Sequence, residues 1–153
     1  MTQEERYGTR SGTYSAWHRR KSTQRFIGIE NAQLLAMVDI DVSLWLEYEE
    51  NTKEPLAIIE TAKDVGQKYK TTTVARNLAI RAHLPCYTVL FTESEKRNPA
   101  DHNYFDIEEF RIKELWPNRE NGWTILKPKK WAEKLLEIRY ESAKNIDNLL
   151  YLS

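Results

Sequence analysis

The sequence of 153 residues has little of what marks a secreted, zinc-binding or membrane protein. It contains a single cysteine, Cys86, so neither a disulfide nor a cysteine-based zinc site can form within one chain. Its apolar runs are far shorter than the roughly 20 residues of a membrane span. The first residues, Met1-Thr-Gln-Glu-Glu-Arg6, are polar, whereas a secretory signal needs an apolar segment. We therefore expect a cytoplasmic protein without a membrane partner, in which Cys86 is a small buried hydrophobe.

Neither sign of charge predominates, and glycine is scarce. The 23 Lys and Arg residues balance the 23 Asp and Glu residues, so composition alone does not indicate a nucleic-acid partner. The five glycines form no phosphate-cradling loop, which disfavours nucleotide hydrolysis. What the sequence does have is 41% hydrophobic residues, and Trp, Tyr and Phe make up 11% of the chain. This material and this length fit one domain with its own core.

The N-terminal residues differ from the rest in composition. Residues 1–25 are polar and rich in Ser, Thr and Arg, which predicts a flexible arm ahead of a single domain over 26–153. The arm contains a basic-aromatic cluster that suits phosphate contacts, with its tryptophan stacking on a base or anchoring the arm. Ordinary solubilising charges explain the cluster equally well. Its members are Trp17, His18, Arg19, Arg20 and Lys21.

Hydrophobic periodicity predicts an α/β fold with a mixed sheet. Alternating and apolar segments predict strands at 41–49 and 56–62, joined as an antiparallel hairpin by a turn at 51–55. A helix from about 72 to 83 and a strand at 86–91 follow. A helix between two strands of one sheet is typical of a crossover connection, so we expect the second and third strands to be parallel.

Further segments complete the predicted domain. Residues 93–104 are polar and predict an exposed loop, and residues 105–115 predict another strand. Pro128 suits the first turn of a C-terminal helix. The apolar residues predicted to be buried are Val74, Ala75, Leu78, Ala79 and Ala82 in the first helix and Trp131, Leu135 and Ile138 in the last, with Trp116 and Trp123 also in the core. Arg76 and Arg81 are predicted to point outward.

Three carboxylates are predicted to converge at the hairpin. Asp39 and Asp41, two residues apart at the start of the first strand, point to the same face of an extended chain. Glu60 lies among apolar residues, where a carboxylate is costly unless it is paired or holds a cation. Such a cluster suits Mg²⁺ or Mn²⁺ as a cofactor, with Lys63 near an attacking water. The alternative is structural, with the aspartates ending a strand and Glu60 in a salt bridge.

These elements resemble the PD-(D/E)xK superfamily, the restriction-endonuclease-like nucleases. The resemblance rests on Asp41, the hairpin, the segment Ile58-Ile-Glu-Thr-Ala-Lys63, the helix and the strand at 86–91. It implies a restriction-endonuclease-like core and a metal-dependent activity on DNA. The whole chain also resembles phage and bacterial proteins with a shared set of motifs. In this sequence those motifs are Trp17-His18-Arg19, Asp39-Ile40-Asp41, Pro55-Leu-Ala-Ile-Ile-Glu60 and Trp123.

One position departs from the superfamily pattern. The pattern places a lysine two residues after the strand acid, where this sequence has Ala62. Lys63 follows, and it faces the other side of a regular strand unless a bulge or the strand end turns it back. Lys68 and Lys70 in the following loop are alternative sources of the cation, and Gln67 resembles the glutamine found there in several such nucleases.

These features favour a metal-dependent nuclease that hydrolyses DNA phosphodiester bonds and is encoded by a phage or mobile element. The resemblance implies that Asp41, Glu60 and Lys63 are catalytic and that Asp39 assists at the metal. The alternative is a non-catalytic module on the same fold that binds nucleic acid or protein, as a phage accessory or inhibitor factor. A third hypothesis is that the protein is a structural component of a virion. A homodimer is compatible with all three hypotheses. The predicted DNA contacts are residues 17–21, Gln67, Lys68, Lys70, Arg76 and Arg81.

Overall fold

The structure is a computed structural model that describes residues 20–35, 42–47, 53–68 and 72–152, together with Thr13 and Trp17. The chain divides into two units, Met1–Asp39 and Ile40–Ser153. In the first unit, helix α2 (Arg20–Ala32) runs across residue 25, where the sequence suggests the end of a flexible arm. Gly28 interrupts the helical geometry with φ 84° and ψ 166°, a conformation that essentially only glycine adopts.

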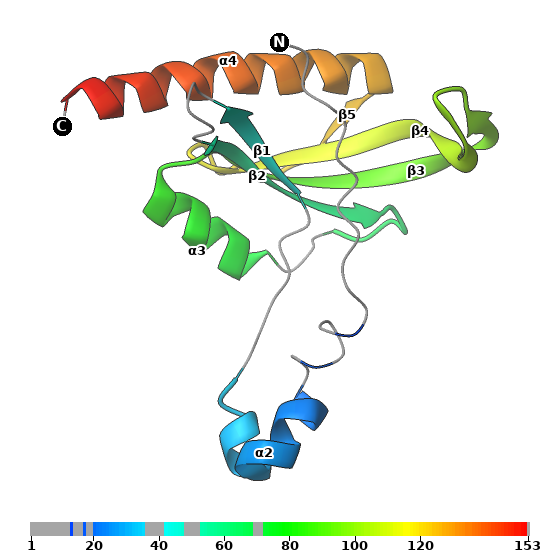
Figure 1. The fold of residues 1–153 in the computed structure, drawn as a ribbon. Helices are drawn as coiled ribbons and strands as arrows, with labels where there is room; N and C mark the ends of the chain where they lie inside the picture. The colour runs from blue at the N-terminus through cyan, green and yellow to red at the C-terminus, as the bar shows by residue number, and fades with distance from the viewer. Residues whose placement is uncertain are drawn as a thin grey trace. The chain divides into compact units, whose positions relative to one another are not determined.

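The second unit is built on a five-stranded mixed sheet in the order β1-β2-β3-β4-β5 (Figure 1). Strands β1 (Val42–Glu47) and β2 (Lys53–Lys63) pair antiparallel, as the alternation predicts. Helix α3 (Thr73–Ala82) then connects β2 to β3 (Cys86–Asn98), and these two strands are parallel. The predicted hairpin and crossover are thus confirmed.

Two antiparallel strands and a long helix complete this unit. Strand β4 (Asp101–Trp116) pairs with β3, and the short strand β5 (Thr124–Leu126) pairs with β4. Helix α4 (Pro128–Leu152) begins at the predicted proline. The prediction of an exposed loop at 93–104 is wrong, because β3 and β4 continue through it as a two-stranded ribbon and turn at residues 99–100.

The sheet separates two hydrophobic cores. The core on the α4 side joins Ile59 and Val89 of the sheet to Trp131 and Ile138 of α4. The core on the α3 side joins Ile58 and Cys86 of the sheet to Ala75 and Ala79 of α3. Figure 1 shows α4 and α3 on opposite sides of the sheet. Because consecutive residues of a strand alternate between faces, even-numbered residues of β2 face α3 and odd-numbered residues face α4.

The buried face of α3 differs from the prediction. Ala75 and Ala79 are buried against the sheet, as predicted, whereas Val74 and Leu78 are 57% and 41% exposed and Ala82 is also exposed. The small alanine side chains let the helix backbone lie close to the sheet, and this rotates the larger residues outward. The same rotation makes Arg76 half-buried instead of outward-pointing, with its Nε donating to the carbonyl oxygen of Leu115 at 3.0 Å.

The tryptophans predicted to be core residues differ in burial. Trp131 is buried, 7% exposed, between α4 and the sheet. Trp116 is partly buried and packs against the core on the α3 side. Trp123 is half-buried beside basic side chains and takes part in polar contacts.

Cys86 is fully buried in β3, as the sequence predicts, and burial raises the pKa of its thiol to about 11. At neutral pH the thiol is therefore protonated, and a protonated thiol is a poor nucleophile. We expect no reaction of the native protein with DTNB at pH 8 over a time in which the urea-unfolded protein reacts completely. Rapid reaction of the native protein would show that Cys86 is accessible.

An ion pair ties the end of β2 to β4. Arg111 donates from Nε to Asp64 Oδ2 at 2.6 Å and from an Nη to Asp64 Oδ1 at 2.7 Å. The Arg111 guanidinium, together with the backbone N–H of Gly66, holds the pKa of the Asp64 carboxyl below its ordinary value. A carboxyl with a lowered folded-state pKa stabilises the fold above its unfolded-state pKa, and the stabilisation is lost as the pH falls through the folded-state pKa.

We therefore expect Asp64→Asn to lower the free energy of unfolding by about 1 to 3 kcal/mol at pH 7. The difference from wild type should shrink as the pH falls from about 5 to about 2. Urea unfolding at several pH values measures both. Glu109→Gln is the control, because its ion pair with Lys127 is exposed and should matter little at any pH. A loss for Asp64→Asn that stays constant down to pH 2 would contradict the account.

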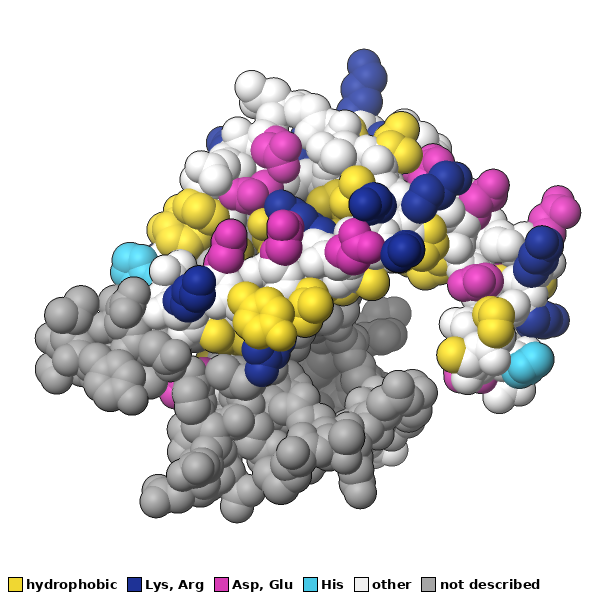
Figure 2. All heavy atoms as spheres, turned by 90° about the horizontal axis from the view of Figure 1, so that it is seen from above, with side chains coloured by type: hydrophobic (Ala, Val, Ile, Leu, Met, Phe, Trp, Pro, Cys, Tyr) yellow, Lys and Arg dark blue, Asp and Glu magenta, His cyan; other side chains and the backbone are white. Residues whose placement is uncertain are grey.

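Among the described residues, no helix is both long enough and apolar enough to cross a membrane. On the side that α4 covers, acidic and basic side chains of the described chain are intermixed (Figure 2). Over the described residues, this side therefore presents no continuous basic surface to a nucleic acid.

Candidate functional site

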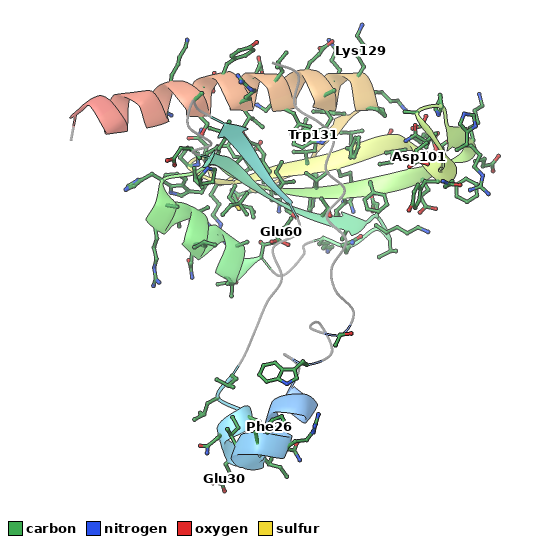
Figure 3. All side chains as sticks on the ribbon, in the orientation of Figure 1. Phe26, Glu30, Glu60, Asp101, Lys129 and Trp131 are labelled. Atoms are coloured by element: carbon green, nitrogen blue, oxygen red, sulfur yellow. The ribbon has the colours of Figure 1, made fainter. Side chains whose placement is uncertain are left out.

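Glu60 is the buried carboxylate of the central sheet. It is 6% exposed on β2 and lies on the α3 side of the sheet, opposite Trp131 (Figure 3). Its partner in the parallel register is Thr88 of β3, and the partner of Thr88 on β4 is Lys113. Because paired residues of neighbouring strands share a face, the sheet places an acid, a hydroxyl and a cation in one row. The sequence predicts Glu60 as the centre of a site but misses Thr88 and Lys113.

Lys63 does not join this row. The pairing of β2 with β3 runs without interruption from Ile58 to Lys63, so no bulge turns the strand between Glu60 and Lys63. Three residues of regular alternation place the two side chains on opposite faces. Lys63 is exposed there, with its Nζ 3.7 Å from a carboxylate oxygen of Glu93. The structure thus does not bring the predicted lysine to the predicted acid.

A pocket of about 460 Å³ lies on the face of Glu60, next to the row. The start of α3, strands β3 and β4, and the segment that joins β4 to β5 form its walls. Thr88 is part of its lining, and its apolar wall includes Leu115 and the ring of Trp123. The charged side chains of the lining are Arg76, Lys113, Arg119 and Glu120.

The cations of the pocket are positioned by contacts other than ion pairs. Arg76 uses Nε to bind the carbonyl oxygen of Leu115, and its two terminal nitrogens have no hydrogen-bond partner within the described chain. Lys113 Nζ lies 4.8 Å from the centroid of the Trp123 ring. Trp123 is itself held by a hydrogen bond from Nε1 to the carbonyl oxygen of Lys68 at 2.9 Å. No described carboxylate forms a salt bridge with Arg76 or Lys113, so their charge is available to a ligand.

The loop after β2 is held by its own polar groups. Gln67 donates from Nε2 to the carbonyl oxygen of Lys63 at 3.0 Å and accepts from the N–H of Val65 at 2.7 Å. The side-chain amide of Gln67 therefore closes the loop, and the backbone carbonyl oxygen of Gln67 accepts from an Nη of Arg111 at 2.9 Å. Lys68 is exposed and contributes its backbone oxygen to Trp123. Within the described chain, the recorded hydrogen bonds of Gln67 and Lys68 do not involve the side chains of Glu60, Thr88 or Lys113.

The remaining predicted site residues fall in three groups. Trp17 is 45% exposed in the first unit, where its ring centroid lies 6.4 Å from that of Phe26. The backbone of Arg20 and Lys21 lies in α2. Arg81 is exposed in the last turn of α3, outside the lining of the pocket. His18, Arg19, Asp39, Asp41 and Lys70 lie outside the described residues.

Among the described residues, no three His, Cys, Asp or Glu side chains gather as metal ligands. Glu60 shares a face of the sheet with the pocket but is not part of its lining. Its carboxylate oxygens are of the hard type that Mg²⁺ and Mn²⁺ prefer. Val42, which follows Asp41 in the sequence, pairs with Ile59, which precedes Glu60. The pairing of β1 with β2 is thus described up to the residues that adjoin Asp41 and Glu60 in the sequence.

A larger pocket, of about 660 Å³, lies on the α4 side between that helix and the end of β4. Its charged lining comprises Glu114, Glu141, Lys134 and His83. Tyr87 donates from its hydroxyl to Glu114 at 3.2 Å, and burial, with the nearby glutamates, raises the pKa of that phenol. Two carboxylates against one lysine make this pocket a poor place for a phosphate.

No protein-family model, curated protein or solved structure matches the chain. The fold and the site therefore define the protein as an α/β domain with a mixed sheet and a polar pocket on its α3 face. Its function has to be argued from these residues.

Proposed function

We propose that the protein is a metal-dependent nuclease that hydrolyses DNA phosphodiester bonds, with Glu60 as a metal ligand. The row of Glu60, Thr88 and Lys113 across three strands carries the proposal. Neighbouring strands lie about 4.8 Å apart, so the backbones at Glu60 and Lys113 are separated by roughly 10 Å. A divalent cation beside the acid and a phosphate beside the lysine fit in this interval. In this proposal Glu60 provides the metal-dependent chemistry, and Lys113 and the other cations of the pocket provide the affinity for phosphate.

Mg²⁺ or Mn²⁺ would be held by Glu60, with Asp39 and Asp41 as the further ligands that the sequence predicts. When bound, such an ion lowers the pKa of a water molecule and neutralises charge that develops on the phosphate. The position of Glu60 supports this role, because the acid shares a face of the sheet with Thr88 and Lys113. A restriction-endonuclease-like core would present its acid in the same element, the strand that precedes the crossover helix.

The cation of the proposed site is Lys113. Lys63 is left out of the proposal because it lies on the opposite face of β2. Lys113 shares the face of Glu60 and lines the adjoining pocket, which lets its ammonium group neutralise a phosphate oxygen. A cation supplied from β4 would compensate for Ala62 at the position where the superfamily pattern has a lysine.

Incubation of the full chain with supercoiled plasmid, single-stranded DNA and branched DNA tests the proposal. We expect cleavage of at least one substrate in Mg²⁺ or Mn²⁺ and none in EDTA. Absence of cleavage for all three substrates in both metals would contradict it, as would cleavage that persists in EDTA.

The second candidate is a non-catalytic module that binds nucleic acid through the same pocket. Two facts favour it: residue 62 is an alanine, and the adjacent lysine lies on the wrong face to replace the expected one. This candidate predicts DNA binding of equal strength with and without metal, and no product at any time. Binding that strengthens sharply with Mn²⁺ would count against it and for the nuclease.

A further inference from the structure

We propose that the pocket between α3 and β4 is a binding site for a phosphate monoester, such as the terminal phosphate of a nucleotide or of a DNA end. This goes beyond the proposed function, because a monoester is not the bond that a nuclease cleaves. It holds equally for a protein that binds such ends without hydrolysis. The argument uses the floor of the pocket, its charge and the end of helix α3.

The floor carries a buried hydroxyl that lacks a partner. Thr88 is 2% exposed, and its Oγ1 makes no hydrogen bond within the described chain, whereas buried polar atoms in proteins are nearly always paired. An unsatisfied buried hydroxyl destabilises a protein by about 1 to 3 kcal/mol. Thr88 also lines the pocket, so an oxyanion there would supply the missing acceptor. A ligand is therefore the simplest reason for a threonine at this position.

The charge of the lining matches a dianion. Arg76, Lys113 and Arg119 are three cations, and Glu120 is the single carboxylate of the lining, which leaves a net charge of plus two. Glu120 is turned toward the backbone, where its Oε1 accepts from the N–H of Glu114 at 2.8 Å. A phosphate monoester carries nearly two negative charges at pH 7, because its second pKa is about 6. A phosphodiester carries one, so the pocket complements the monoester better.

The start of helix α3 adds donors on one side of the pocket. Thr72 and Thr73 line it, and Thr72 makes no side-chain capping hydrogen bond to the helix. The first N–H groups of a helix lack intrahelical partners and bind anions favourably. Arg76 lies one turn further along the same helix with its guanidinium held at the wall by Leu115. A guanidinium and helix N–H groups together are a recurrent phosphate environment.

Calorimetric titration of the full chain in EDTA tests the site, because no cleavage occurs without metal. We expect thymidine 5′-monophosphate to bind and thymidine not to bind. A single-stranded oligonucleotide with a 5′-phosphate should bind at least about tenfold more tightly than the same oligonucleotide with a 5′-hydroxyl. Equal affinity of the two oligonucleotides, or no binding of the monophosphate, would overturn the proposal.

Two substitutions on one helix locate the site. Arg76→Gln should weaken binding of the phosphorylated oligonucleotide at least about tenfold, because it removes a charge-assisted contact. Arg81→Gln is the control on the same helix: Arg81 is exposed and outside the lining of the pocket, so the preference for the phosphorylated over the unphosphorylated oligonucleotide should stay within about twofold of wild type even if Arg81 contacts the rest of the strand, as the sequence predicts. Equal losses in the two variants would show that charge on the helix, and not the pocket, attracts the phosphate, and this would also overturn the proposal.

Thr88→Val separates a ligand role from a structural one. If the hydroxyl of Thr88 donates only to a bound anion, its removal should not lower the free energy of unfolding of the ligand-free protein. The same substitution should weaken monophosphate binding at least several-fold. A variant that loses stability without ligand would show that the hydroxyl has a structural partner and contradict the proposal. Because all these measurements use EDTA, their failure leaves the metal-dependent nuclease standing, and a failed cleavage assay leaves the phosphate site standing.

Discussion

Replacing Glu60 with glutamine should lower the rate of metal-dependent DNA cleavage by more than about a hundredfold. Changes to residues that only support a metal ligand already cost 10- to 100-fold in affinity or activity, so loss of a direct ligand should cost at least as much. Glutamine has the shape of glutamate and keeps one carbonyl oxygen, so the buried position on β2 is still filled. The rate is measured as loss of supercoiled plasmid at a fixed Mn²⁺ concentration.

The matched control is Glu93→Gln on the neighbouring strand. Glu93 is a partly exposed glutamate of β3. Its carboxylate pairs with Lys63, which lies on the face of β2 opposite Glu60. Its neutralisation changes the net charge of the protein as Glu60→Gln does, but it should leave the cleavage rate within about twofold. Equal cleavage by wild type and Glu60→Gln would remove Glu60 from the site and with it the observation on which the nuclease proposal rests.

Truncation of Trp131 to alanine should lower the free energy of unfolding by about 3 to 5 kcal/mol, the range for large aromatic residues in a core. The Trp131 ring is 7% exposed and lies 6.2 Å, between centroids, from each of Tyr87 and Phe110. Together with Ile138, it packs α4 against the sheet. Urea unfolding followed by circular dichroism measures the change. If the alanine variant does not fold, Trp131→Phe, for which we expect a smaller loss, is measured in its place.

Tyr140→Ala provides the comparison on the same helix. Tyr140 is 57% exposed and contacts Arg139, whose guanidinium carbon lies 5.3 Å from the ring centroid. Its truncation should cost less than about 1 kcal/mol. If Trp131→Ala and Tyr140→Ala had the same effect, α4 would not be anchored to the sheet by its buried face, and the core on the α4 side would be wrongly described.

Much of the fold could be predicted because its signals are local. The hairpin of β1 and β2 follows from alternation and a turn, and α4 follows from Pro128 and the spacing of Trp131 and Ile138. These patterns exist because one face of each element meets the core. The ribbon at 93–104 gave no such signal, because most of its side chains are exposed and it has no buried face; backbone pairing and local contacts, such as that of Arg97 with Phe105, connect its strands.

Less of the candidate site could be predicted, because it depends on pairing between distant strands. Glu60 was visible as an acid within an apolar strand. Thr88 and Lys113 became neighbours of Glu60 only through the registers of β2 with β3 and of β3 with β4. A helix and not a tight turn joins β2 to β3, and the pairing of β3 with β4 shifts at four places, so turn geometry does not give these registers. One signal was present: Arg111 and Lys113 alternate with Phe110 and Ile112, which places two cations on the face opposite an apolar one.

The orientation of α3 is a second feature that the pattern of apolar residues did not predict correctly. The predicted buried face combined Val74 and Leu78 with Ala75 and Ala79, whereas in the structure only the two alanines of this set are buried. Close approach of a helix to a sheet requires small residues at the contact, so size and hydrophobicity give opposite answers here. Arg76, which the sequence predicts as an outward-pointing DNA contact, is instead half-buried in the lining of the pocket.

The most direct test of the proposed nuclease site is anomalous diffraction from crystals soaked in Mn²⁺. The account predicts an anomalous peak about 2 to 2.5 Å from a carboxylate oxygen of Glu60, on the α3 side of the sheet and within reach of a phosphate beside Lys113. The same soak of Glu60→Gln crystals should show no peak at that position. A crystal with Mn²⁺ bound elsewhere, and with the Glu60 carboxylate paired only to protein groups, would contradict the central claim.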